Sequence, residues 1–159
     1  MKKEIIIGLV LLIIIIVIII LKPFKKRVVI SDISKLSFSY STGYAMYSSV
    51  LYEINYQDDK YLLKIKPDKV PDEEAKEYEL DEKQIQEIIN ILTKYNVSSW
   101  NGFDKVDKNV LDGNSFTFKL VTKSGEEIYA HGYMKWPNNY KEVKNELNNY
   151  FMNIYKEEE

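Results

Sequence analysis

Residues 49–65 read SVLYEINYQDDKYLLKI and decide the fold, because apolar and polar side chains alternate along most of their length. The alternation places two sets of side chains on opposite faces: Val50, Tyr52, Ile54 and Tyr56 on one, and Ser49, Leu51, Glu53 and Asn55 on the other. A period of two is typical of a half-buried β-strand. The pair Asp58-Asp59 interrupts the pattern and predicts a tight turn. The stretch therefore predicts an antiparallel hairpin with one face in the core.

The same alternation extends the predicted sheet on both sides of this hairpin. Upstream, residues 37–41 read SFSYS and are followed by the turn signal Thr42-Gly43. Downstream, residues 77–80 predict a short strand after a charged loop with two prolines. Residues 116–121 and 128–133 then alternate around a glycine-containing turn and predict a second hairpin. Together these segments predict four to six strands.

Two segments carry the 3.6-residue apolar period of amphipathic helices. The first follows Asp81, a good N-cap, with Gln84 three positions later as in a capping box. The second is predicted to start at Trp136-Pro137, because proline is well tolerated in the first turn of a helix. The predicted buried positions are Ile85, Ile88, Ile89 and Leu92 in the first helix, and Tyr140, Val143, Leu147, Tyr150 or Phe151, and Ile154 in the second.

The element order β-β-β-(β)-α-β-β-α predicts an α+β fold. The simplest packing is one antiparallel sheet of four to six strands with both helices on one face. The other face carries polar side chains and is predicted to face water. Residues 97–114 show no period and are predicted to be irregular. The core face of the sheet is predicted to consist of Phe38, Tyr52, Ile54, Leu63, Phe118 and Ile128.

Residues 5–21, IIIGLVLLIIIIVIIIL, precede this domain and contain no polar side chain. At 1.5 Å per residue, a helix of this length covers roughly 25 Å, and the apolar core of a bilayer is about 30 Å thick. Lys3 and Lys22 flank the segment and can reach the two interfaces. We therefore expect a transmembrane helix that binds the lipid bilayer through Ile5–Leu21. The predicted divisions are 1–21 for the N-terminal anchor, 22–35 for a basic stalk, 36–155 for the globular domain and 156–159 for a frayed tail.

The charges beside the apolar segment leave its orientation open. Lys22, Lys25, Lys26 and Arg27 follow it, and the positive-inside rule places such a flank in the cytoplasm. The Met-Lys-Lys start is instead typical of a bacterial signal anchor, which leaves the following domain outside, and long domains translocate largely regardless of charge. We expect a single-pass protein of the cell membrane with an extracellular C-terminal domain. A domain that faces the cytoplasm is the alternative.

The composition excludes several classes of function. The chain has 22 basic and 24 acidic residues, and residues 1–27 contain six of the basic and one of the acidic ones. The rest of the chain therefore has 16 basic and 23 acidic residues and a net charge of −7. Nucleic acid is therefore not expected as a partner, because its binding depends on lysine and arginine. The chain has no cysteine, which excludes disulfides and thiol chemistry. Arg27 is the only arginine and His131 the only histidine, which disfavours catalytic triads and zinc sites.

Aromatic side chains are the best candidates for a recognition surface. Tyr40, Tyr44 and Tyr47 belong to a segment rich in serine and tyrosine, and Trp100 and Trp136 lie beside predicted loops. Such rings can stack on sugars or hold a peptide. In the alternative interpretation the two tryptophans plug the ends of the core, because one follows the first helix and the other precedes the second.

Three other groups of polar residues carry weaker hypotheses, and no cofactor or metal is predicted from them. An acidic loop could bind a cation through oxygen ligands, but it lacks the EF-hand spacing and is better explained by turn formation. An acidic run could supply a glycosidase-like carboxylate pair, but such runs are more often solvated surface. The lone histidine has no evident partner. These groups are Asp104, Asp107, Asn109 and Asp112 for the cation, Glu73, Glu74, Glu77 and Glu79 for the carboxylates, and His131.

Three segments resemble a family of small uncharacterised proteins: SFSYSTGYAMYSS at 37–49, YNVSSWNGFDK at 95–105 and DGNSFTFKLVTKSGEEIYAHGYMKWPNNYKEV at 112–143. Proteins of that family are membrane-anchored or lipid-anchored and extracytoplasmic, and they come from low-GC Gram-positive bacteria. The resemblance covers about residues 36–155 and implies an exported domain held at the cell surface, without an assigned activity. It marks as pattern positions Trp100, Gly102, Phe103, Asp112, Gly113, Gly132, Pro137 and Tyr140.

These observations favour a non-enzymatic binding or interaction module over an enzyme. Its expected partner is an envelope polymer, a peptide or another membrane protein. One alternative is a cell-envelope hydrolase that acts with carboxylates, which would require two acidic residues in one pocket with shifted pKa values. Another is a membrane-tethered regulator that faces the cytoplasm, and membrane topology alone distinguishes it.

Overall fold

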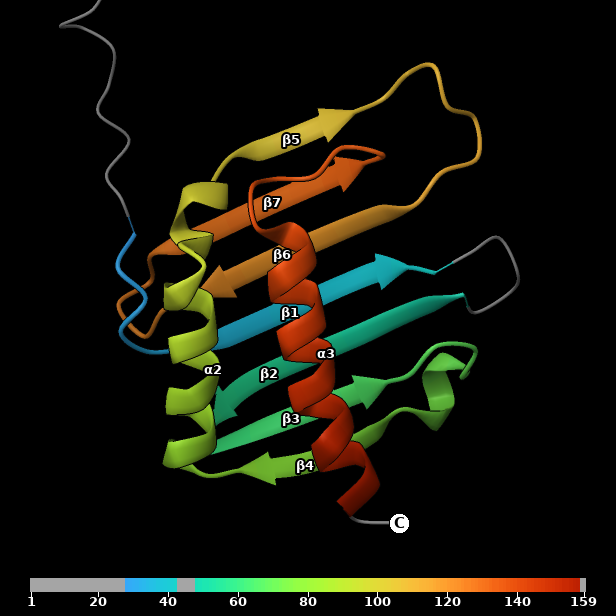
Figure 1. The fold of residues 1–159 in the computed structure, drawn as a ribbon. Coiled ribbons are helices and arrows are strands. Elements are labelled where there is room, and N and C mark those ends of the chain that lie inside the picture. Colours follow the sequence, from blue (N-terminus) through green and yellow to red (C-terminus); the bar gives the residue numbers. More distant parts are fainter. Residues whose placement is uncertain (1–27, 43–47, 158–159) are drawn as a thin grey trace, which may run out of the picture.

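The computed structural model describes residues 28–42 and 48–157 of the chain. In this part, seven strands form one mixed sheet and two α-helices lie across one of its faces (Figure 1). The α+β class is confirmed, but the predicted sheet of four to six antiparallel strands is too small, and one strand pair is parallel. The predicted anchor at 5–21 lies outside the described residues. Within them, no helix is both long and apolar enough to cross a membrane.

The strands follow the order β4-β3-β2-β1-β6-β7-β5 across the sheet. Two short 3-10 helices, η1 and η2, accompany the α-helices. The bounds are β1 (Lys35–Ser41), β2 (Ser49–Gln57), β3 (Lys60–Lys66), η1 (Asp72–Glu74), β4 (Lys76–Leu80), α2 (Glu82–Lys94), η2 (Val97–Trp100), β5 (Phe103–Val106), β6 (Ser115–Val121), β7 (Glu127–Tyr133) and α3 (Tyr140–Glu157).

The first strand in the sequence occupies the centre of the sheet. β1 pairs antiparallel with β2 on one side and with β6 on the other. Phe38 lies opposite Tyr52 in β2 and opposite Phe118 in β6, and all three side chains are fully buried. The register therefore places the predicted apolar positions of three strands on one face, as the period of two requires.

β5 was not predicted, because residues 97–114 show no period. Its four residues pair in parallel with β7, with Phe103 opposite Ala130 and Val106 opposite Tyr133. Three of the four β5 residues are exposed, so this edge strand has no alternation of buried and exposed side chains that the sequence could reveal. Backbone hydrogen bonds join β5 to β7. The amide of Gly102, directly before β5, adds one more by donating to the Tyr129 carbonyl at 2.8 Å.

Both helices run across the strands, which explains how the chain passes from one sheet edge to the other (Figure 1). α2 begins with the predicted capping box: Asp81 and Gln84 exchange hydrogen bonds of 2.7 and 2.9 Å between side chain and backbone. It leads from β4 at one edge toward β5 at the other. α3 leads back, and it begins at Tyr140 rather than at Trp136-Pro137. Asn139 directly before it has a φ of 61°, which a right-handed helix does not allow.

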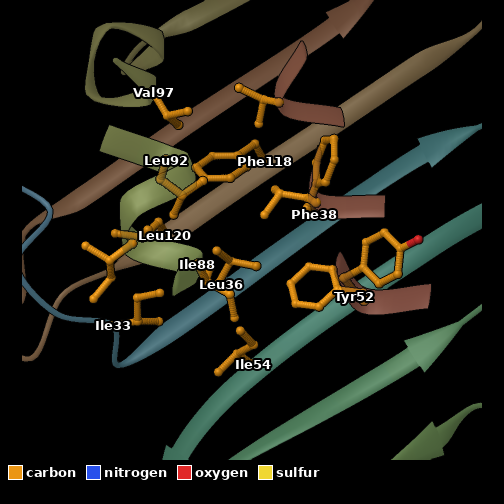
Figure 2. Close-up of a cluster of buried hydrophobic side chains, with 14 of the residues drawn as sticks. Ile33, Leu36, Phe38, Tyr52, Ile54, Ile88, Leu92, Val97, Phe118 and Leu120 are labelled. Carbon is orange, nitrogen blue, oxygen red and sulfur yellow. The ribbon is translucent and has the colours of Figure 1, made fainter. Parts of the chain in front are cut away.

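The core lies between the helices and the sheet, as Figure 2 shows for its central part. The predicted core face is confirmed, since all six of its side chains are fully buried. The core also takes in Val28, Ile30 and Ile33, which fall in the predicted stalk at 22–35. These three side chains extend the packed domain to the first described residue. Ile33 lies at the end of the core at which β1 begins (Figure 2).

Candidate binding surface on the helix-free sheet face

The sheet face that carries no helix is polar, because strand residues between the core positions point to it. Pairing partners that lie opposite each other join these residues into rows across the strands. One row crosses six strands from Asp104 in β5 to Lys66 in β3. It consists of Asp104, His131, Thr117, Ser39, Leu51 and Lys66.

A hollow of about 330 Å³ opens on this face, and we call it the serine hollow. It lies where β1 and β3 end and β2 and β6 begin, so four strands contribute to it. Hydroxyl groups dominate its polar lining, and a single ammonium and a single carboxylate complete it. The polar side chains are those of Ser39, Ser41, Ser49, Ser115, Thr117, Lys66 and Asp72.

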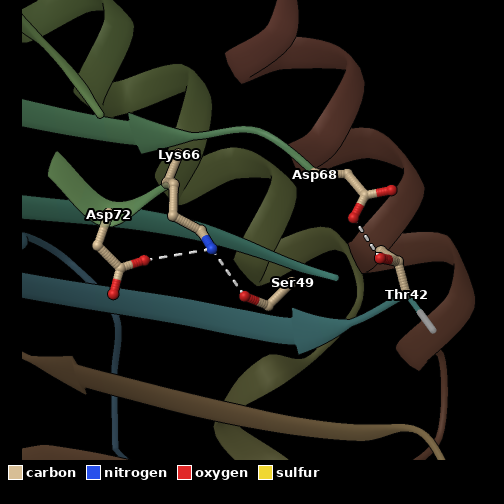
Figure 3. A network of polar contacts seen from close by, with 5 residues as sticks. All are labelled: Thr42, Ser49, Lys66, Asp68 and Asp72. Carbon is tan, nitrogen blue, oxygen red and sulfur yellow. Dashed lines mark hydrogen bonds and ion pairs between the residues drawn. The ribbon is translucent and has the colours of Figure 1, made fainter. Parts of the chain in front are cut away.

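Lys66 is the most unusual of these side chains, because only 3% of it is exposed. Its Nζ donates to Ser49 Oγ at 2.8 Å and lies 3.3 Å from Asp72 Oδ1 (Figure 3). The Asp72 side chain is 83% exposed and belongs to η1, a three-residue turn with no buried residue. A buried ammonium needs hydrogen bonds and a counter-charge. Here the serine is part of the sheet, whereas the carboxylate comes from a surface turn.

A second polar contact closes the same end of the sheet. The Thr42 hydroxyl donates to the Asp68 carboxylate (Figure 3), and the Thr42 amide donates to the Ser48 carbonyl at 2.9 Å. Thr42 and Ser48 follow β1 and precede β2, and Asp68 follows β3. The connections that surround the serine hollow are therefore tied to one another beside it.

His131 has a partner that the sequence did not reveal. Its Nδ1 lies 3.0 Å from Asp104 Oδ1, across the parallel pair of β7 and β5. The two residues are 27 positions apart, and β5 was predicted as irregular, so no sequence signal joined them. Both side chains reach solvent, and exposed pairs of this kind contribute little to stability. Thr117 lies opposite His131 on β6, so this pair adjoins the serine hollow.

A serine beside a lysine is also the arrangement of a nucleophile with its general base. Here the lysine Nζ contacts the Asp72 carboxylate as well as Ser49 Oγ, so the serine belongs to an ion-pair network. Such a network can hold a polar ligand by hydrogen bonds and charge.

The predicted aromatic surface is divided by the structure. Trp100 and Tyr40 are buried: the indole Nε1 donates to the Asn138 carbonyl at 2.9 Å, and the Tyr40 hydroxyl donates to Asn148. Both rings belong to the core. Trp136 is 40% exposed and stacks on Tyr140, with ring centroids 4.6 Å apart. Tyr44 and Tyr47 lie outside the described residues.

The acidic groups are held by surface contacts. Asp107 bonds to Lys135 at 2.9 Å and accepts from the Asn109 amide at 3.1 Å, and these bonds lower the pKa of Asp107. Asp104 pairs with His131, and Glu79 pairs with Lys60 at 2.8 Å. Within residues 28–42 and 48–157, no group of three or more histidine or acidic side chains is placed to hold a metal ion.

Comparisons of this chain with protein-family models, with curated proteins and with solved structures found no match.

Proposed function

We propose that this chain is a non-enzymatic binding module, held at the cell membrane by residues 5–21 with its domain on the outer side. Its ligand is a polar component of the cell envelope. The observation that carries the proposal is the serine hollow, in which hydroxyl groups from three strands line the same space as the Lys66 ammonium of a fourth. The resemblance to anchored extracytoplasmic proteins supports the proposed location.

The position of the serine hollow suits such a module. Val28 lies at the end of the domain where β1 begins, whereas Ser41 and Lys66 lie where β1 and β3 end (Figure 1). A seven-residue strand is roughly 23 Å long, so the hollow opens about that far from the point where the chain enters the domain. A ligand could reach it without approaching the surface to which residues 5–21 would attach.

The hydrolase alternative receives less support from the carboxyl groups. Asp107 and Glu146 have lowered pKa values, each because of a hydrogen bond from a surface lysine, Lys135 and Lys94 respectively. A general acid needs the opposite shift, which keeps its proton on near neutral pH. These two residues also belong to different surfaces, β5–β6 loop and α3, and not to one pocket.

Membrane topology tests the proposed location. The chain lacks cysteine, so Ser124→Cys at the exposed turn between β6 and β7 introduces its only thiol. A membrane-impermeant maleimide should label this variant in intact cells, and Lys2→Cys, on the other side of residues 5–21, only after lysis. The reverse pattern would favour the cytoplasmic regulator and contradict the proposal.

Binding to envelope material tests the proposed role of the hollow. Thr117→Tyr places a large ring in the serine hollow, and Lys119→Tyr places the same ring two residues along β6, on the same face but outside the hollow lining. We expect the full chain in detergent to co-sediment with protein-free envelope fragments, and Thr117→Tyr alone to lose this binding. Equal binding by both variants, or no binding by the unchanged chain, would contradict the proposal.

A further inference from the structure

We propose that the serine hollow binds a phosphate ester at Lys66, and that Asp72 is a built-in counter-ion which this ligand displaces. The inference deepens the proposed function, because it names the chemical group that the hollow takes. It starts from the unequal burial of the two partners, 3% of the Lys66 side chain against 83% of the Asp72 side chain.

The exposed partner can leave at low cost. Asp72 is hydrated in its present position, and its N···O separation from Lys66 is 3.3 Å, longer than the 2.8 Å from Lys66 to Ser49. The exposed carboxylate stays solvated when it leaves, and a ligand anion can take over its role as counter-charge to the ammonium. η1, which carries Asp72, lies between Pro71 and Ala75 and buries none of its residues. An anion that enters the hollow can therefore replace the carboxylate without disturbing the core.

The buried partner cannot leave with it. Lys66 ends β3, and Nζ stays bonded to Ser49 of the neighbouring strand β2 when Asp72 moves away. A nearly buried ammonium without a counter-charge is unfavourable. The Lys66 ammonium thus needs an anionic partner, which is either the Asp72 carboxylate or an anionic group of a ligand. This need gives the hollow affinity for an external anion.

The hydroxyl lining favours phosphate over carboxylate. The hollow is lined by hydroxyl groups of β1, β2 and β6 beside Lys66 of β3, namely Ser39, Ser41, Ser49, Ser115 and Thr117. A hydroxyl group can donate one hydrogen bond while it accepts another. A phosphate ester offers more acceptor oxygens than a carboxylate, and they point in tetrahedral directions that donors from several strands can meet. A volume of about 330 Å³ also leaves room for the organic part of the ester.

The source of the phosphate that we propose is a soluble or polymer-bound ester and not a lipid headgroup. The serine hollow lies at the end of the sheet opposite Val28, where the chain enters the domain (Figure 1). A domain tethered at that point turns the hollow away from its own membrane.

The test is a titration of the full-length, ¹⁵N-labelled chain in detergent micelles with sn-glycerol 3-phosphate, followed by the amide resonances of Ser39, Ser49 and Ser115. We expect saturable shifts at these three residues. Lys66→Met should weaken binding by at least about tenfold, because a charge-assisted hydrogen bond is lost. Asp72→Asn should strengthen binding about two- to fivefold, because the competing carboxylate is gone.

Matched controls come from the same elements. Lys64→Met changes a lysine on the same strand and the same face, and Glu74→Gln changes an exposed acid in the same turn. Neither side chain lines the serine hollow, so both variants should bind like the unchanged chain. If the spectrum of Lys66→Met shows that this variant is unfolded, the test depends on Asp72→Asn alone. Unchanged or weaker binding of glycerol 3-phosphate by Asp72→Asn then overturns the inference.

Other probes separate the possible failures. Glycerol that binds as tightly as its phosphate would show that the hollow recognises hydroxyl groups only, and tighter binding to phosphatidylglycerol vesicles than to soluble glycerol 3-phosphate would assign the site to a lipid. Either result overturns the inference. The chain could fail to bind glycerol 3-phosphate and yet bind envelope fragments, with Thr117→Tyr abolishing that binding. In that case the inference fails while the proposed function stands.

Discussion

Tyr52 in β2 donates its hydroxyl hydrogen to the side-chain oxygen of Asn148 in α3 at 2.7 Å, across 96 residues of chain. The same oxygen accepts from Tyr40 of β1 at 2.8 Å. One helix residue therefore satisfies the hydroxyl groups of two buried tyrosines from adjacent strands. The rings contribute apolar contact to the core, and the shared acceptor removes the cost of burying their polar ends.

Replacing this shared acceptor should destabilise the domain. Asn148→Ala leaves two largely buried hydroxyl groups without their acceptor, and we expect the free energy of unfolding to fall by roughly 2–4 kcal/mol. Urea denaturation followed by circular dichroism measures this change. Asn149→Ala, at the exposed neighbouring position, should change the same quantity by less than about 0.5 kcal/mol. Similar values for both variants would mean that the two hydrogen bonds do not stabilise the fold.

Stability should also fall at high pH. Burial raises the pKa of Tyr40, Tyr52, Tyr140 and Tyr150 above the usual value of 10. The unfolded chain then loses these protons first, so the stabilisation is complete below about pH 10 and is lost as pH rises above that value. Urea denaturation at pH 8, 10 and 11 should show a progressive decrease, with a smaller slope for Tyr52→Phe. A constant free energy of unfolding up to pH 11 would contradict this.

Gly132 should tolerate no side chain. A Cβ atom there would overlap the Lys135 carbonyl oxygen and lie 2.5 Å from Phe116 Cε1. Gly132→Ala should therefore cost about 1–3 kcal/mol of stability. Gly125 has a φ of 84° with nothing near its Cβ position, and asparagine adopts such a conformation readily. Gly125→Asn is therefore the control, with an expected cost below about 1 kcal/mol. Gly132→Ala should therefore unfold at a lower midpoint temperature than Gly125→Asn. Equal midpoints would contradict the predicted overlap at the Gly132 Cβ position.

The two tryptophans should respond differently to solvent and to mutation. Trp100 is buried against Phe116 and Phe118, whereas Trp136 is partly exposed on Tyr140. Trp100→Ala should cost about 3–5 kcal/mol, and Trp136→Ala about 1 kcal/mol. Each tryptophan can be observed alone: Trp136 in the variant Trp100→Phe, and Trp100 in the variant Trp136→Phe. Acrylamide should quench the fluorescence of Trp136 more strongly than that of Trp100. Equal quenching would show that both indoles are exposed to the same degree.

Much of the fold follows from local patterns in the sequence. The alternation at 37–41 and 49–65 predicts which side chains of β1, β2 and β3 enter the core, and each period marks the buried side of its element. The capping box at Asp81 predicts the start of α2 to the residue. These features depend on near neighbours, so one segment at a time is enough to predict them.

The remainder depends on contacts between distant segments. β5 has no period because three of its four residues are exposed, and the late start of α3 follows from the left-handed conformation of Asn139. The burial of Lys66 could not be predicted either, because its partners Ser49 and Asp72 lie on another strand and on a turn. The serine hollow also needs β6 beside β1, and no local pattern connects these two strands. Its serines were visible in the sequence, but their convergence was not.

The central place of β1 has a consequence for the order in which the sheet can be completed. β1 is made first, and its partner β2 follows within a few residues, but its partner β6 begins only at Ser115. During synthesis or export from the N-terminus, one edge of β1 therefore stays unpaired until most of the domain has emerged. Such an edge attracts other strands. A chain stalled or cut before Ser115 would expose Phe38 and the hydrogen-bonding groups around it, which makes truncated forms of this protein prone to aggregation.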